Sequence, residues 1–372
     1  MVNIDKDVIE MATFNQKAKI RVIGVGGGGN NAVDRMIEDG VEGIDFIAVN
    51  TDAQALHRSK APIRIQLGEK LTGGLGAGGV PMVGAKAAEE SRDQILKSIS
   101  DSNMLFVTCG MGGGTGTGAA PIIASLAKDL GILTLAIVTK PFAFEGKKRM
   151  SNANEGIEEL RQHVDTLLTI PNERLMEVLD ESVTFKDALK KADEVLTQGV
   201  QGISTLISKP GDINLDFADV KSIMQDKGMG YIGIGTASGK NRAMIAAERA
   251  INSPMLETSI RGAGSILLNV TGSADMALHE VRAAATFIRE STGMDNDNVI
   301  YGTSINEDLK DEVVITVVAT EFGESFGTVK IPNVKPGVSK PSGEPTASTP
   351  TKSDDESDGK IKLPIFVQRD RR

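Results

Sequence analysis

The segment GMGGGTGTG at residues 110–118 constrains this chain more than any other part of its sequence. It follows an apolar run at 104–109, typical of a buried strand, and precedes a helical pattern at 119–130. Glycines at such a junction let backbone amides approach an anion, and Thr115 and Thr117 add hydroxyl donors. A plain glycine linker would not be flanked by apolar elements on both sides. The segment therefore predicts a phosphate-binding loop in an α/β fold.

A first glycine segment, GVGGGGNN at 24–31, lies between an apolar run at 19–25 and a helical pattern at 31–39. It also satisfies G-x-G-x-x-G, with Asp45 and Asp52 near the distance expected for an acid that contacts a ribose. Taken alone, the segment leaves two interpretations open, which are phosphate binding and a merely tight strand-to-helix turn.

A third glycine-rich segment, GGLGAGG at 73–79, precedes a helical pattern at 82–99. We expect it to close over a terminal phosphate and to report its presence; the alternative is a flexible surface loop. The sequence contains no G-x-x-x-x-G-K-[ST], which excludes a P-loop protein. An ordinary dinucleotide fold has no need of the second, longer glycine segment.

The alternation of strands and helices predicts a mainly parallel sheet covered on both faces. A long helix is expected at 185–207, where Gly199 and Gly202 each cost about 1 kcal/mol unless they permit close packing. The predicted class is α/β, with a parallel-sheet nucleotide-binding domain joined by a central helix to a smaller α/β domain. The predicted regions are an N-terminal extension at 1–18, the nucleotide-binding domain at 19–184, the central helix at 185–208 and the smaller domain at 209–331.

Composition argues against several classes of protein. The net charge of −9 argues against a nucleic-acid partner, and a single cysteine, Cys109, excludes an intrachain disulfide and fits a reducing cytoplasm. We expect no secretory signal and no membrane span, since the most apolar run, at 132–138, is too short. The stretch at 332–359 is rich in Pro, Ser, Thr and acids and should be disordered. The last residues, KIKLPIFVQRDRR at 360–372, are predicted to dock on a partner.

Several separate motifs carry a resemblance to the tubulin/FtsZ family. They are AVNTDAQAL at 48–56, GGGTGTG at 112–118, KPFAFEGKKRM at 140–150, TIPNERL at 169–175 and NLDFADV at 214–220. The chain resembles this family from residue 19 to about residue 320, and residues 360–372 are similar to the family's tail peptide. The resemblance implies a tubulin-like GTPase that binds GTP and GDP, with Mg²⁺ held mainly by phosphates and water.

The resemblance also implies roles for single residues. Glu145 and Arg149 would contact the nucleotide near its ribose, Asn172 would lie near it, and Asp193 would accept hydrogen bonds from guanine. From the residues alone, Glu145 and Arg149 are a surface ion pair worth only about 0.3–0.5 kcal/mol, and Asp193 is a solvated helix acid. The residues expected around the phosphates are Gly27, Gly28, Gly29, Asn30, Asn31, Gly114, Thr115 and Gly116, with Ala77, Gly78 and Gly79 from the third segment.

Two positions depart from the family pattern. Leu189 stands where many relatives have an aromatic residue that stacks on the base. Asn30 stands where many have a glycine, and asparagine tolerates a left-handed backbone better than most residues.

Asp216 and Asp219 admit two compatible interpretations. Alone, Asp216 is a helix N-cap with Asp219 in the first turn. The resemblance gives both acids a catalytic role in trans, in which they enter the nucleotide site of the next subunit and polarise the attacking water.

The resemblance thus implies an assembly-dependent GTPase, a filament protein of bacterial cell division that forms the septal-ring scaffold. It would be cytoplasmic and assemble at midcell near the inner face of the membrane. Its partners would be its own copies, head to tail, and membrane-anchor and regulatory division proteins that bind 360–372. The alternatives are an NAD-type oxidoreductase, for which His57, His163 and His279 offer no motif, and a scaffold that binds GTP without hydrolysing it. No direct metal ligand is assigned.

Overall fold

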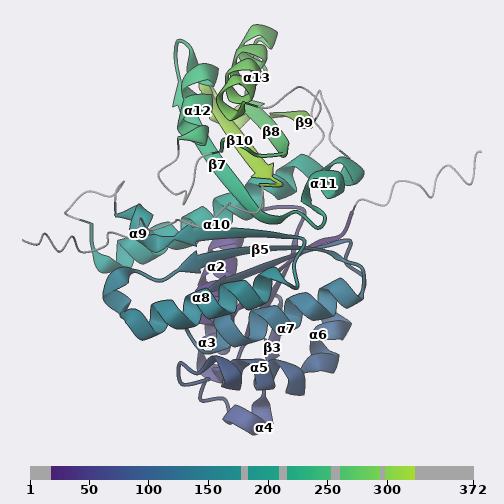
Figure 1. Ribbon diagram of the computed structural model, residues 1–372, viewed down its shortest axis with the longest axis vertical. Helices are drawn as coiled ribbons and strands as arrows, with labels where there is room; N and C mark the ends of the chain where they lie inside the picture. The colour runs from purple at the N-terminus through teal and green to yellow at the C-terminus, as the bar shows by residue number, and fades with distance from the viewer. Residues whose placement is uncertain (1–17, 177–182, 209–215, 253–259, 294–297, 323–372) are drawn as a thin grey trace, which may run out of the picture. The chain divides into compact units, whose positions relative to one another are not determined.

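The computed structural model describes residues 18–176, 183–208, 216–252, 260–293 and 298–322 (Figure 1). The predicted N-terminal extension up to residue 17, the linker at 332–359 and the docking peptide at 360–372 lie outside the described residues. So do the first two residues of the motif NLDFADV.

The part of the chain before α10 alternates strands and helices as the sequence predicts. Its elements are β1 (Ile20–Val25), α2 (Gly26–Glu38), β2 (Asp45–Asn50), α3 (Ala53–Arg58), β3 (Ile63–Gln66), α4 (Glu69–Thr72), α5 (Pro81–Glu90), α6 (Arg92–Ile99), β4 (Met104–Gly110), α7 (Thr115–Asp129), β5 (Leu133–Lys140), η1 (Ala143–Glu145), α8 (Lys147–Arg161), β6 (Thr166–Pro171) and α9 (Asn172–Leu175).

The single helix predicted at 82–99 is two helices that meet at Ser91. The hydroxyl of this buried serine accepts a hydrogen bond from the Gly68 backbone N–H at 3.0 Å and donates to the Gln66 carbonyl at 3.3 Å. Serine that bonds to nearby backbone competes with the helix, and here it bonds to the segment after β3. Hydrophobic spacing alone does not reveal such a break.

The remaining described elements begin with the long helix expected near 185–207. They are α10 (Phe185–Ser208), α11 (Phe217–Met224), β7 (Gly228–Ser238), α12 (Arg242–Ile251), β8 (Ser265–Gly272), α13 (Leu278–Thr292), β9 (Val299–Ile305), η2 (Glu307–Leu309) and β10 (Glu312–Thr320).

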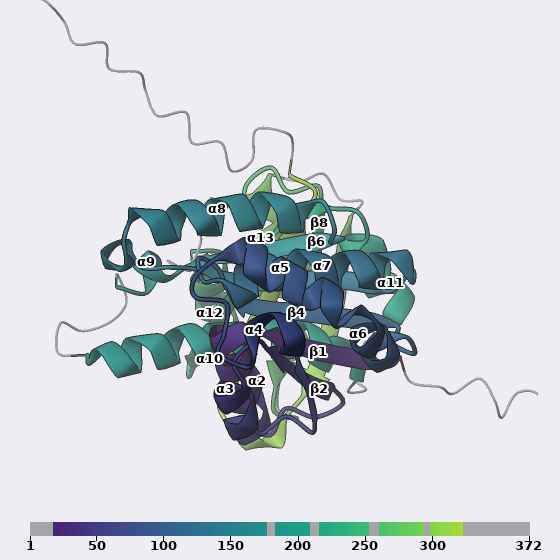
Figure 2. The same ribbon diagram turned by 90° about the horizontal axis from the view of Figure 1, so that it is seen from below.

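The strands follow the order β3-β2-β1-β4-β5-β6-β7-β10-β8-β9. The pairs from β3 to β7 are parallel, β10 is antiparallel to both β7 and β8, and β9 is parallel to β8. The prediction of a mainly parallel α/β sheet is confirmed. Since α9 follows the end of β6, it marks the edge of the sheet where these parallel strands end. α11 lies at the opposite edge, where the parallel strands begin (Figure 2).

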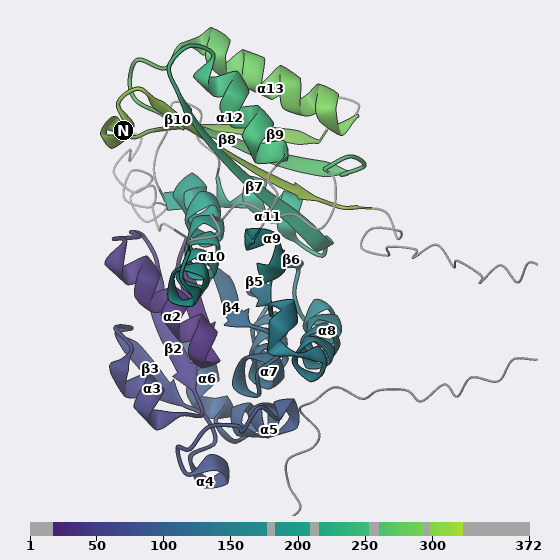
Figure 3. The same cartoon turned by 90° about the vertical axis from the view of Figure 1, so that its left-hand side faces the viewer.

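Helices cover both faces of the parallel strands. α2 and α10 lie on one face, and α7 and α8 lie on the other (Figure 3). The two glycines inside α10 permit the close packing that the sequence suggested. A Cβ on Gly199 would lie 3.2 Å from Ile137 Cδ1 on β5, and one on Gly202 would lie 2.8 Å from Thr316 Cγ2 on β10. Helix α10 therefore packs closely against strands from both parts of the chain.

A separate apolar core joins β7, β8 and β10 to α12 and α13. It includes Ile266, Ile288, Ile315 and Val317, all fully or almost fully buried. Burial of this kind supplies most of the free energy that holds a sheet against its helices. This part of the chain is thus a packed α/β unit with its own core.

Candidate active site

The first glycine segment is the start of a helix rather than a loop. β1 ends at Val25 and α2 begins at Gly26, earlier than the predicted start at residue 31. Gly26 has a φ of +71°, a conformation that favours glycine. Gly27 and Gly28 are exposed, and a Cβ on Gly27 would meet no atom within 4 Å. No side chain caps α2, so its first amide groups are free to bind an anion.

Asn30 does not adopt the left-handed backbone that the sequence analysis allowed for. It lies within α2 and is buried. Its Nδ2 donates to the Gly24 carbonyl at 2.8 Å and to the Val49 carbonyl at 3.3 Å, while its Oδ1 accepts from Asn50 Nδ2 at 2.8 Å. The side chain therefore holds the ends of β1 and β2 together beneath the glycines. Asn31, the next residue, is exposed.

The second glycine segment packs against the first, because β1 and β4 are neighbouring parallel strands. α7 begins at Thr115, earlier than the helix predicted from residue 119. A Cβ on Gly26 would lie 2.9 Å from the Gly116 amide nitrogen. Thr117 is buried and its Oγ1 accepts from the Gly112 N–H at 2.8 Å, so it shapes the segment instead of serving as the predicted outward donor. The N-termini of α2 and α7 thus meet at one edge of the sheet.

The third glycine segment packs on the second. A Cβ on Gly114 would lie 2.8 Å from the Cβ of Ala77, which is itself buried. Gly78 and Gly79 follow and are exposed. This packing favours a segment that covers the phosphate loop over a free surface loop.

Glu145 and Arg149 form the ion pair that their spacing predicted. Arg149 Nε lies 2.9 Å from Glu145 Oε2, and Glu145 Oε1 accepts from the Phe142 N–H at 2.9 Å. A Cβ on Gly112 would lie 2.7 Å from Arg149 Cγ, so the pair lies beside the second glycine segment. A structural ion pair and a position next to a bound nucleotide are therefore compatible here.

Two polar groups on α9 and α10 lack hydrogen-bond partners among the described residues. Asn172 is buried and its Oδ1 accepts no hydrogen bond. The carboxylate of Asp193 also makes none, and its burial raises its pKa to about 7, against the opposing effect of Arg35. Asp193 is half-buried, so its carboxylate is less solvated than the residues alone suggested. An unsatisfied polar group is costly where it is shielded from water, so the buried Asn172 and the half-buried Asp193 are both suited to bond a polar ligand. Leu189, on the preceding turn, is 38% exposed.

Asp216 and Asp219 form the predicted cap of α11. Asp216 Oδ1 accepts from the Asp219 N–H at 2.8 Å, and Asp219 Oδ2 accepts from the Asp216 N–H at 3.1 Å. This reciprocal arrangement is a capping box, with an aspartate in each position. Asp216 is exposed and Asp219 is partly exposed, so both carboxylates can accept further bonds from outside the chain.

The acid pair and the glycine segments lie at opposite edges of the parallel strands. α11 leads into β7, whose Gly228 pairs with Thr166 at the start of β6. Lys128, near the end of α7, contacts Asp226 in the turn after α11 at 3.4 Å. α7 has 15 residues and so spans about 22 Å from its start in the second glycine segment. The tertiary structure therefore does not bring the acids to the glycines of the same chain.

Two features that bear on cofactors and membranes concern the described residues alone. No group of three or more His, Cys, Asp and Glu side chains there is placed to hold a metal ion. No helix there has both the length and the apolar character needed to cross a bilayer.

Residues 19–180 match the sequence model of the tubulin/FtsZ family GTPase domain, and residues 228–323 match the FtsZ family C-terminal domain. An empty FtsZ dimer from M. jannaschii is 46% identical to this chain, with a TM-score of 0.77 over 86% of this chain and 92% of that one. The chain belongs to the tubulin/FtsZ family of GTPases. It binds guanine nucleotides and hydrolyses GTP, and the resemblance seen in its motifs is confirmed.

Other solved structures of the family agree. A mutant FtsZ from M. jannaschii is 48% identical, with a TM-score of 0.79 over 85% of this chain and 94% of that one. CetZ2 from Haloferax volcanii, solved as a protofilament with GTPγS, is 20% identical, with a TM-score of 0.70 over 81% of this chain and 92% of that one. The likeness to CetZ2 shows a shared fold.

Sequence reasoning did not single out two buried residues that contact the glycine segments. Thr51 is buried, and its Oγ1 lies 2.6 Å from the Oγ1 of Thr115. Asn50 is buried and donates to Asn30. Both lie in AVNTDAQAL, which served only to mark the family. A signal was present, because polar residues directly after a buried parallel strand lie at the edge where such sheets bind ligands.

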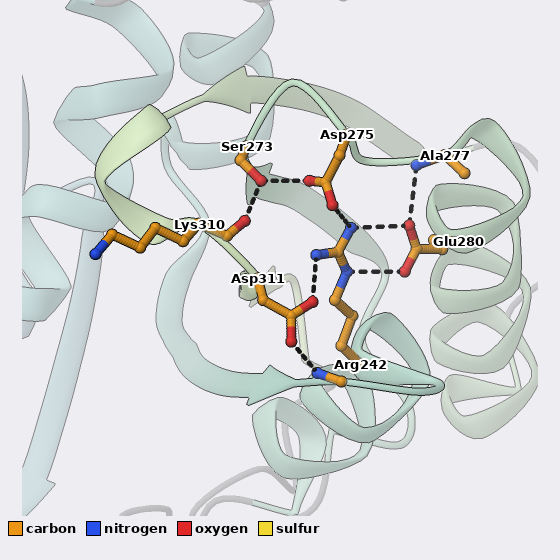
Figure 4. Close-up of polar contacts among 8 residues, drawn as sticks. Arg242, Ser273, Asp275, Ala277, Glu280, Lys310 and Asp311 are labelled. Atoms are coloured by element: carbon orange, nitrogen blue, oxygen red, sulfur yellow. Dashed lines mark hydrogen bonds and ion pairs between the residues drawn. The ribbon is translucent and has the colours of Figure 1, made fainter.

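A second polar cluster lies in the region of the FtsZ C-terminal domain (Figure 4). Arg242, only 4% exposed, bonds Glu280 through Nε at 3.0 Å and Nη2 at 3.2 Å, and Asp311 through Nη1 at 3.2 Å. It also pairs with Asp275 at 3.3 Å. The bond with Glu280 raises the pKa of Arg242 and lowers that of Glu280. The cluster ties together the turns before α12, α13 and β10, which is a structural role.

Proposed function

We propose that this GTPase assembles head to tail and hydrolyses GTP at the contact between subunits. The observation that carries the proposal is the placement of Asp216 and Asp219 opposite the glycine segments. When subunits stack in one orientation, the acid edge of one faces the glycine edge of the next. Contacts of this head-to-tail kind extend into filaments unless a rotation closes them into a ring.

The proposed nucleotide extends along the glycine edge from α10 to α5. Its phosphates lie on the free amides at the starts of α2 and α7, at Gly27–Gly29 and Gly114–Gly116, with Asn30 supporting them from below and Asn31 beside them. Ala77, Gly78 and Gly79 cover the terminal phosphate. Glu145 and Arg149 lie near the ribose, and Asn172 and Asp193 contact the guanine. Asn172 Oδ1 and the Asp193 carboxylate, which have no hydrogen-bond partner within the described part of the chain, support this orientation.

The catalytic role proposed for the acids uses the oxygens that the capping box leaves free. Each carboxylate has one oxygen in the cap, which leaves the other oxygen available to a group outside the chain. From there Asp216 and Asp219 would orient and polarise the water that attacks the terminal phosphate in line. Amide groups at two helix N-termini would stabilise the charge on the phosphates. Mg²⁺, held mainly by phosphate oxygens and water, would supply further charge neutralisation.

The proposed cellular role is that of a filament in cell division, forming the septal-ring scaffold at midcell in the cytoplasm near the inner face of the membrane. The peptide 360–372 would bind membrane anchors and regulatory division proteins. Two related proteins support assembly, because an FtsZ was solved as a dimer and CetZ2 as a protofilament.

Turnover measured against protein concentration tests the proposal. The specific rate of phosphate release from GTP should be low in dilute protein and rise above a threshold at which light scattering also rises. Full specific activity in dilute monomer would disprove the shared site. Assembly with GTP but without phosphate release would instead indicate a scaffold that does not hydrolyse its nucleotide.

A further inference from the structure

Thr51 bonds to both the second and the third glycine segments. It follows β2 and is fully buried. Its hydroxyl lies 2.6 Å from that of Thr115, the first residue of α7. Its carbonyl accepts from the Gly76 N–H at 3.2 Å and from the Thr72 hydroxyl at 3.3 Å. Thr51 thus contacts the second glycine segment with its side chain and the third glycine segment with its backbone.

The adjoining backbone reinforces this link. The Ala53 N–H donates to the Gly74 carbonyl at 3.0 Å, and Asp52 pairs with Leu75 in an isolated β-bridge. Asp52 also caps α3 by accepting from Gln54 and Ala55. The third segment is therefore attached to the start of α3, and a change at Thr51 would be transmitted to it.

The two hydroxyls can bond in either direction, because each carries one hydrogen and accepts through its lone pairs. Thr115 is half-buried beside Gly114, on which the third segment packs. α4 and α5, which flank this segment, lie at the end of the sheet away from α10 (Figure 3). In the proposed orientation, with the base on α10, the last phosphate lies toward α5 and the segment that packs on Gly114, which precedes Thr115.

We propose that Thr51 is a positioning residue that makes the site distinguish GTP from GDP. A terminal phosphate only accepts, so Thr115 must donate to it and Thr51 must donate to Thr115. A chain of hydrogen bonds in one direction is stronger than its separate members. With GDP, Thr115 can donate to Thr51 instead. This inference rests on the proposed nucleotide orientation and assigns the residue that senses the last phosphate.

The third glycine segment connects Thr51 to the surface of the protein. It carries Leu75, 88% exposed, and is followed by Met82, 67% exposed, at the start of α5. Because the Gly76 N–H bonds the Thr51 carbonyl and Asp52 pairs with Leu75, a shift of Thr51 would be passed to Leu75. The terminal phosphate thereby orders the exposed surface next to it.

The test compares Thr51→Val, which removes the hydroxyl and keeps the shape, with Thr51→Ser, which keeps the hydroxyl. Thr108→Val is the matched control, because Thr108 is also fully buried and its hydroxyl has no partner among the described residues. GTPγS and GDP binding are measured on the full chain below its assembly threshold. Thr51→Val should weaken GTPγS binding about tenfold and GDP binding less than about twofold. Thr51→Ser and Thr108→Val should change neither by more than about twofold.

Amide hydrogen exchange at residues 72–80 supplies a second measurement. In the native chain these amides should exchange more slowly with GTPγS than with GDP, and Thr51→Val should abolish the difference. Should Thr51→Val fail to fold, Thr51→Ala removes the same hydroxyl with a smaller side chain. Equal loss for both nucleotides, or unchanged affinity for both, would refute the role of Thr51. A native chain that binds GTPγS but never hydrolyses GTP would refute the proposed function instead.

Discussion

Lys128 and Asp226 form an ion pair of 3.4 Å that joins the end of α7 to the turn after α11. Because α7 begins in the second glycine segment, this contact places the turn after α11 one helix length from the phosphate loop. It is the geometric reason for expecting the acids to act on another subunit.

Mixing two inactive variants tests that expectation. Asp219→Ala keeps an intact pocket, whereas Gly114→Ser blocks the pocket, because its Cβ would lie 2.8 Å from that of Ala77. In an equal mixture that coassembles at random, about a quarter of the contacts join an intact pocket to intact acids. Phosphate release should recover to roughly that fraction of the native rate. A mixture of Asp219→Ala with Asp219→Asn is the control and should recover nothing. No gain in the first mixture would contradict catalysis in trans.

Asp193→Ala should narrow the preference for GTP over ATP. In the native chain the pKa of Asp193 is about 7, and guanine binds the ionised carboxylate, so GTP affinity should rise with pH and level off above 7. Below that pH the change is at most about tenfold per unit. The ratio of native to variant affinity isolates this effect, since titration of the nucleotide's own phosphates is common to both proteins. Asp187→Ala, an exposed acid on the same helix, is the control. Full discrimination against ATP in Asp193→Ala would remove Asp193 from the site.

The same substitution should stabilise the nucleotide-free chain at high pH. The folded pKa of Asp193, about 7, lies above its unfolded value of about 3.9, so stability is lost as pH rises between them. Asp193→Ala removes this loss. We therefore expect the urea midpoint of Asp193→Ala, minus that of the native chain, to be larger at pH 8 than at pH 4. A native advantage that grows with pH would show that the carboxylate is well solvated or paired.

Arg242→Met should destabilise the region around α12 and α13. It leaves Glu280, whose side chain is 16% exposed, without its partner, and such a loss costs about 3 kcal/mol. Arg242 lowers the pKa of Glu280, so the native stabilisation is full above about pH 4.5 and lost as pH falls through the lowered value. Urea unfolding at pH 7 and pH 3.5 measures both effects. Arg282→Met, at an exposed position, should change stability by less than about 0.5 kcal/mol. Equal effects of the two substitutions would argue against the cluster.

Deleting residues 360–372 should leave GTP turnover and polymerisation almost unchanged and abolish recruitment to vesicles coated with an anchor protein. The apolar residues Ile365 and Phe366 are the expected contacts, so replacing both with alanine should reproduce the loss of recruitment. Replacing Asp354 and Asp355, upstream of the peptide, is the control. Lost GTPase activity in the truncated chain would show that the peptide has a structural role.

Hydrophobic pattern predicted β1 and β4 because a parallel strand covered on both faces is apolar along its length. It gave no prediction for β6. It predicted helix starts poorly, since α2 and α7 begin within glycine segments that local propensity disfavours. Those starts are stable because the two segments pack backbone to backbone, as at Gly26 and Gly116. Ser91 likewise ends α5 through a contact with residues far earlier in the chain.

The sequence by itself determined the α/β class, the three glycine segments, the family and the capping pair Asp216 and Asp219, because each depends on local spacing or on a contiguous motif. Only the tertiary structure decided that Asn30 and Thr117 bond inward and that Thr51 meets Thr115. It also decided that Asp193 is half-buried, with no hydrogen-bond partner for its carboxylate among the described residues. It also placed the acid pair at the far edge of the sheet from the glycines. These outcomes depend on which strands become neighbours and on the length of α7. Such contacts between distant parts of the chain determine how far a side chain is buried, what its pKa is and which residues it can reach.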